Sequence, residues 1–76
     1  MINYVKKIKD LVSEKAGMDP AEIKDESYFE DDLNLGELEV AEIVEELEDT
    51  YSISLSEYEE METVGDLITA VSENLE

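Results

Sequence analysis

The segment GELEVAEIVEELEDTY, residues 36–51, decides the fold class of this 76-residue chain. Its apolar residues recur every three or four positions, a spacing that predicts an amphipathic helix over about 36–50. The predicted apolar stripe consists of Leu38, Ala41, Val44, Leu47 and Tyr51. The opposite face is acidic, with Glu37, Glu39, Glu42, Glu45, Glu46, Glu48 and Asp49. Such a helix must bury its apolar side against other elements, so partner helices are expected before and after it.

Two further helices are predicted from the same periodicity. The first has an apolar face of Val5, Ile8, Leu11, Val12 and Ala16 and is expected to stop at Gly17. The last is expected to start at a Thr63 cap and to bury Val64, Leu67, Ile68, Val71 and Leu75. A short helical turn is expected over 57–61. We therefore predict an all-α protein, a small four-helix bundle of three long helices and one short helix, forming a single domain over 1–76.

A loop over about 18–35 separates the first two helices. Pro20 is expected to open a single turn within it, and an ordered loop is predicted because three residues can anchor it inward. These anchors are Tyr28, Phe29 and Leu33.

Composition excludes several classes of function. The chain has 23 acids, 5 bases, no His and no Cys, and its net charge is −18. This charge repels phosphate backbones and anionic lipids, so neither nucleic acid nor a membrane is an expected partner. Without His, Cys, Arg or any close Ser–Lys pair, the chain offers no group to activate a nucleophile, so we expect no enzyme. We also expect no metal site beyond loose cation coordination by carboxylates such as Glu30, Asp31 and Asp32 near Glu37 and Glu39. A cytoplasmic monomer is expected.

Three stretches of the chain resemble acyl carrier proteins. SYFEDDL, residues 27–33, is similar to the family's stretch ending in Phe-x-x-Asp-Leu, and LEVAEIVEELED, residues 38–49, resembles its recognition helix. ETVGDL, residues 62–67, resembles the start of the family's last helix. The resemblance covers the whole chain and implies the carrier fold and a link to fatty-acid or polyketide synthesis.

The chain departs from the family at the residue that holds the prosthetic group. Family members have a Ser at the start of the second helix, usually within Asp-Ser-Leu, and its hydroxyl is joined to 4′-phosphopantetheine. Here the tripeptide is Gly36-Glu37-Leu38. A carboxylate would give an acyl phosphate, which hydrolyses readily, whereas Ser gives a stable phosphodiester. Glu37 therefore stands at the cofactor-binding position, and neither its modification nor any bound cofactor is expected.

Three interpretations of Glu37 stay open. It can be an ordinary acid in the first turn of a helix, where negative charge is favourable. Its charge can stand in for the phosphate of the missing arm. It can also be a substitution in a carrier whose parent had Gly-Ser-Leu.

The resemblance also implies a partner-binding surface on the second helix. Carrier proteins offer carboxylates to Arg and Lys of their enzymes at the positions of Glu42, Glu48 and Asp49, beside an apolar residue at the position of Leu38. Glu45 stands where the family usually has an apolar residue. For each acid alone a solvated face is the favoured explanation, and a docking role explains the acids equally well only when they are taken as a group.

Two hypotheses follow. The first is a non-enzymatic interaction module that binds the basic surface of a protein partner, such as a fatty-acid or polyketide synthesis enzyme, through its acidic second helix. The alternative is a genuine acyl carrier protein of those pathways, seen as a Ser-to-Glu variant at position 37.

Overall fold

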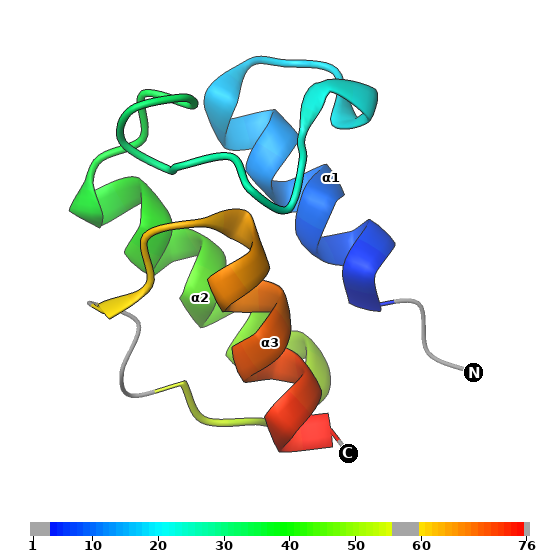
Figure 1. The fold of residues 1–76 in the computed structure, drawn as a ribbon. Helices are drawn as coiled ribbons and strands as arrows, with labels where there is room; N and C mark the ends of the chain where they lie inside the picture. The colour runs from blue at the N-terminus through cyan, green and yellow to red at the C-terminus, as the bar shows by residue number, and fades with distance from the viewer. Residues whose placement is uncertain (1–3, 56–59, 76) are drawn as a thin grey trace.

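The computed structural model describes residues 4–55 and 60–75, and these residues confirm the all-α class. Three α-helices, α1 (Tyr4–Ala16), α2 (Glu37–Tyr51) and α3 (Val64–Leu75), are joined by loops, with a 3₁₀ turn, η1 (Pro20–Glu22), in the first loop. The loop between α1 and α2 passes across one end of the bundle (Figure 1). The fourth, short helix expected over 57–61 falls mostly on residues 57–59, which lie outside the described residues, so the described part of the chain holds three α-helices.

Local signals end the helices where the sequence predicts. Gly17 adopts a left-handed φ of 69°, and its N–H donates to the Ser13 carbonyl at 2.9 Å, which stops α1. At the start of α3, the Asp66 N–H donates to Thr63 Oγ1 at 3.1 Å. The Thr63 N–H in turn donates to Asp66 Oδ2 at 3.2 Å, a reciprocal capping arrangement.

The buried face of α2 differs from the predicted stripe. Val40, Ile43, Val44 and Leu47 are buried, whereas Leu38 is 73% exposed and Ala41 is only partly buried. From Leu38 to Leu47 the residues of the predicted stripe are spaced three positions apart. Each step of three residues falls about 60° short of a full helical turn. Three steps carry a residue about half way round the helix, so the predicted stripe began on the solvent side.

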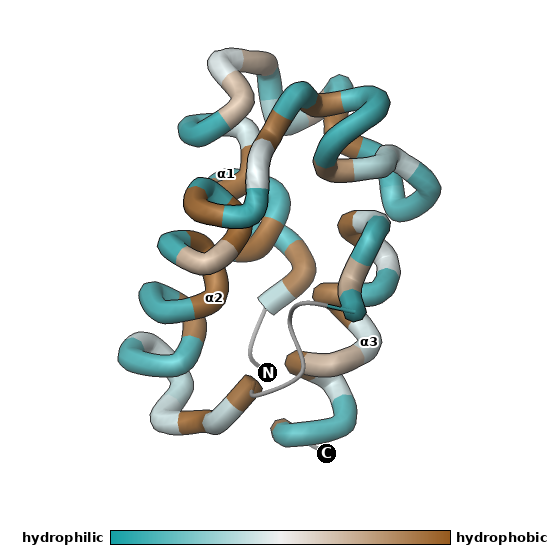
Figure 2. The backbone as a smooth tube through the Cα atoms, turned by 90° about the vertical axis from the view of Figure 1, so that its left-hand side faces the viewer, coloured by the Kyte–Doolittle hydropathy of each residue, from teal (hydrophilic) through white to brown (hydrophobic). Residues whose placement is uncertain are grey.

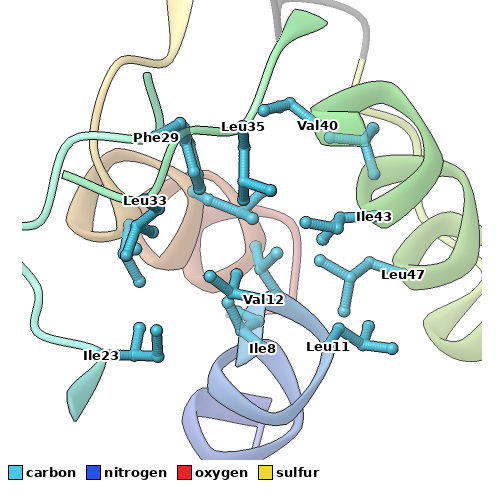
Figure 3. Close-up of a cluster of buried hydrophobic side chains, with 14 of the residues drawn as sticks. Ile8, Leu11, Val12, Ile23, Phe29, Leu33, Leu35, Val40, Ile43 and Leu47 are labelled. Carbon is cyan, nitrogen blue, oxygen red and sulfur yellow. The ribbon is translucent and has the colours of Figure 1, made fainter. Parts of the chain in front are cut away.

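The core lies where the three helices and the loop before α2 meet. Its side chains come from all four segments. Those labelled in Figure 3, which belong to α1, the loop and α2, point toward one another. α2 has hydrophobic residues along its inner side and hydrophilic residues along its outer edge (Figure 2). The loop contributes Ile23, Phe29, Leu33 and Leu35 to the core, so it is ordered as predicted. Tyr28 is the exception, because its side chain is 44% exposed instead of facing inward.

Within the described ranges, no helix combines the length and apolar character that crossing a bilayer requires.

Candidate functional site

The loop before α2 is fixed to the start of α3 by three backbone hydrogen bonds. The Phe29 N–H donates to the Glu62 carbonyl at 2.9 Å, and the Val64 N–H donates to the Ser27 carbonyl at 3.0 Å. The Gly65 N–H donates to the Asp25 carbonyl at 2.7 Å. A Cβ at residue 65 would lie 2.9 Å from that same carbonyl oxygen, so this close approach requires glycine. These contacts set the place from which α2 begins.

Gly36 is the cap residue of α2, and Glu37 is the first residue of the helix. Gly36 has an ordinary extended backbone, with φ −85°, and offers no capping side chain. Its N–H donates to Glu39 Oε2 at 2.8 Å, so only the reverse half of a capping box exists. Glu37 is exposed, and its carboxylate has no hydrogen-bond or ion-pair partner among the described residues. Residue 37 is therefore presented to solvent at the positive end of α2.

A surface hollow of about 540 Å³ lies beside Glu37. Segments before α2, in its first turn and before α3 line it: Tyr28, Phe29, Glu30, Asp31, Leu35, Gly36, Glu37, Val40, Met61 and Glu62. Sequence reasoning missed this hollow, because it depends on the loop and residues 61–62 meeting in space.

Four of the five predicted partner-binding residues share the outer face of α2. Leu38, Glu42, Glu45 and Asp49 follow one another at steps of four, three and four, and all are exposed. Glu45 and Asp49 have no partner among the described residues. Leu38 is thus an exposed apolar side chain on an otherwise acidic face.

Glu42 and Glu48 have roles inside the protein that sequence reasoning missed. Glu42 Oε1 lies 3.0 Å from Lys15 Nζ, an ion pair that joins α2 to α1. Glu48 Oε2 accepts the Leu55 N–H at 2.7 Å and is partly buried, so it ties the end of α2 to the following loop. Neither contact has a local signal in the sequence, because the partners lie 27 and 7 residues away.

Carboxylates near the start of α2 are used in backbone hydrogen bonds. Asp32 Oδ2 accepts the Tyr28 N–H at 2.8 Å, and Glu39 accepts from Gly36. In the part of the chain that the structure describes, no three Asp or Glu side chains are arranged to hold a metal ion.

Comparisons with known proteins agree with this architecture. A family profile described as a phosphopantetheine attachment site matches residues 6–71. An acyl carrier protein from Clostridium acetobutylicum is 35% identical over 72 residues, which cover 92% of this chain and 94% of the relative. The chain belongs to the acyl carrier protein family. The resemblance stated from the sequence is thereby confirmed, and the family's role is to carry acyl groups and not to catalyse. In this chain, residue 37 lies within the range matched by the family profile and is Glu.

Proposed function

We propose that residues 1–76 act as one interaction domain of the acyl carrier fold that docks on the basic surface of a biosynthetic enzyme through α2 and carries no prosthetic arm. The proposal that the domain docks on a partner rests on the outer face of α2. Leu38, 73% exposed, lies there with Glu45 and Asp49, whose carboxylates have no partner among the described residues. An exposed apolar side chain among free acids suits a basic partner with an apolar centre, because burial and charge then act together.

The absence of an arm is inferred from the chemistry of residue 37. 4′-Phosphopantetheine attaches through a hydroxyl, and Glu37 offers only a carboxylate, so the group does not fit this residue. The serines nearest in the sequence do not replace it. Ser27 Oγ accepts the Lys24 N–H at 3.1 Å within the loop, and Ser52 follows the opposite end of α2.

A monomer in the cytoplasm is the setting we propose for this domain. Its net charge of −18 makes copies of the chain repel one another, which favours a monomer. Sedimentation at low and high salt measures the mass directly, and a dimer at both salt concentrations would contradict this part of the proposal.

The genuine acyl carrier protein seen as a Ser-to-Glu variant is the second candidate. It is favoured by the exposed placement of residue 37 at the first turn of α2, where a Ser would be open to an enzyme. The codon for residue 37 in the source organism separates the two candidates, because a Ser codon would establish the variant.

Docking is tested with a charge-reversed α2 and a matched control. The partner is first recovered from the source organism by affinity capture and identified by mass spectrometry. Glu45→Lys with Asp49→Lys should then slow its association by about tenfold or more, because charge complementarity acts mainly on the association rate. Glu26→Lys with Glu73→Lys changes the net charge by the same amount at exposed residues outside α2 and should retain most of the binding. Equal loss in both variants would mean that the acidity acts as a general field and would refute α2 as the docking site.

A further inference from the structure

We propose that residues 25–29, here called the strap, open and close as one unit with the first turn of α3, and that an ion pair between Lys9 and Asp25 latches this unit to α1. The strap is part of the loop that crosses the end of the bundle, and it is bonded to the start of α3 (Figure 1). Its opening requires no partner molecule and does not involve the outer face of α2, so it goes beyond the proposed docking function.

The start of α3 satisfies its backbone donors in two different ways. An α-helix leaves its first N–H groups without acceptors inside the helix. Thr63 and Asp66 supply acceptors to each other, because the N–H of each donates to the side chain of the other at 3.2 and 3.1 Å. The N–H groups of Val64 and Gly65 donate instead to two carbonyls of the strap, at 3.0 and 2.7 Å. The strap is therefore one half of the cap of α3.

The strap and the first turn of α3 depend on each other. If the strap moves away, the N–H groups of Val64 and Gly65 lose their acceptors beside the core, where the Val64 side chain is fully buried. A backbone donor that is shut away from water costs about as much free energy as a lost hydrogen bond. The first turn must therefore unwind or admit water when the strap leaves. The Phe29 N–H, which donates to the Glu62 carbonyl at 2.9 Å, is released in the same step.

Few apolar contacts hold the strap itself. None of residues 25–28 is buried, and the apolar anchors Ile23 and Phe29 lie before the strap and at its end. Segments that bury few apolar groups and whose backbone hydrogen bonds lie near solvent open at a lower free energy than the core. We therefore expect the strap to open while the three helices remain packed.

Lys9 connects the strap to α1. Its Nζ lies 3.1 Å from Asp25 Oδ1. The Lys9 side chain is 28% exposed and so is more enclosed than Lys6 and Lys15, the lysines of two other ion pairs, which are 70% and 36% exposed. Asp25 contributes its carboxylate to this pair and its carbonyl to the start of α3. One residue thus joins the strap to both helices.

Native-state hydrogen exchange of the ¹⁵N-labelled full chain, followed by nuclear magnetic resonance, measures the opening at each amide. After correction for their intrinsic rates, the Phe29, Val64 and Gly65 amides should share one opening equilibrium and be open more often than Val12 of the core. Their exchange should depend only weakly on low concentrations of urea, because local opening exposes little surface. Unrelated openings of the three amides, or exchange of all three only through global unfolding, would overturn the proposal.

Three variants test the latch. Lys9→Gln and Asp25→Asn each remove the ion pair, retain every carbonyl of the strap and change the net charge in opposite directions. Both should speed the exchange of the three amides about twofold to fivefold, the effect expected of a partly exposed pair. Glu26→Gln is the matched control and should leave the exchange unchanged, because Glu26 is an exposed residue of the strap with no partner among the described residues.

Two results would refute the latch. One is equal acceleration by Glu26→Gln and Asp25→Asn, which would mean that the charge of the strap acts without the pair. The other is unchanged exchange in both Lys9→Gln and Asp25→Asn. Circular dichroism of each variant verifies that the helices are retained.

Discussion

Lys15 of α1 and Glu42 of α2 form an ion pair, with 3.0 Å between Nζ and Oε1. Both side chains are partly open to solvent, 36% and 49% exposed, so the pair is a surface one. It neutralises one acid of the outer face of α2 from within the protein. A docking partner therefore meets Glu45 and Asp49 as free carboxylates and Glu42 as one already paired.

The pair should contribute little to stability. A double-mutant cycle with Lys15→Gln, Glu42→Gln and both changes together should give a coupling free energy of about 0.2–1 kcal/mol, since exposed pairs are solvated and screened. Urea unfolding measures it. Coupling above about 2 kcal/mol would show that water screens this pair far less than its exposure implies.

Gly65→Ala should destabilise the protein by about 1–3 kcal/mol, because the new Cβ would lie 2.9 Å from the Asp25 carbonyl oxygen, a backbone atom that cannot swing away. Gly36→Ala is the matched control. There the Cβ meets Glu39 Oε2 at 3.0 Å, the end of a flexible side chain, so a loss below about 1 kcal/mol is expected. Urea unfolding of both variants tests this order, and equal losses would contradict it.

Glu48→Ala should cost about 1–2 kcal/mol, because the Leu55 N–H loses a carboxylate acceptor at 2.7 Å. Glu48→Gln retains an acceptor oxygen and should cost less. Glu45→Ala, at an exposed residue of the same helix, should stay within about 0.5 kcal/mol of the parent. If Glu48→Ala and Glu45→Ala lowered the stability equally in thermal unfolding, the contact between Glu48 and the loop would contribute nothing to the free energy of unfolding.

The melting temperature should rise with added salt. The chain has 23 acids and 5 bases, and ions shorten the range of the repulsion to about 8 Å at physiological ionic strength. Millimolar magnesium or calcium should raise it more than sodium at equal ionic strength, because a divalent ion can bridge two carboxylates. Calorimetry from low to high salt measures this, and a flat profile would show that the repulsion is negligible.

The sequence predicts the helices and their ends because these depend on neighbouring residues. Gly17, Thr63 and Pro20 act within one turn of chain, and each stands where the structure uses it. The buried side of α2 was predicted only in part: Val44 and Leu47 are buried as expected, but the first half of the stripe was wrong, since steps of three drift around a helix. Leu38 and Ala41 were predicted to be buried but are not, whereas Val40 and Ile43 are buried in the structure.

Only part of the candidate site can be predicted from the sequence, because the sequence determines neighbours within one helix but not contacts between distant segments. Leu38, Glu45 and Asp49 share a face because they belong to one helix, whose period is known. The Glu42 pair with Lys15, the Glu48 bond to Leu55 and the exposed Tyr28 depend on segments that meet only after folding. No spacing along the chain encodes them.

The most direct test of the central claim, that this chain carries no 4′-phosphopantetheine arm, is a mass measurement. The chain is incubated with a phosphopantetheinyl transferase and coenzyme A, and its mass is then determined. The parent should show no mass increase, because Glu37 offers no hydroxyl. Glu37→Ser should gain one phosphopantetheine, and Glu45→Ser, which places a hydroxyl elsewhere on α2, should gain none. A mass increase of the parent chain at any residue would contradict the account.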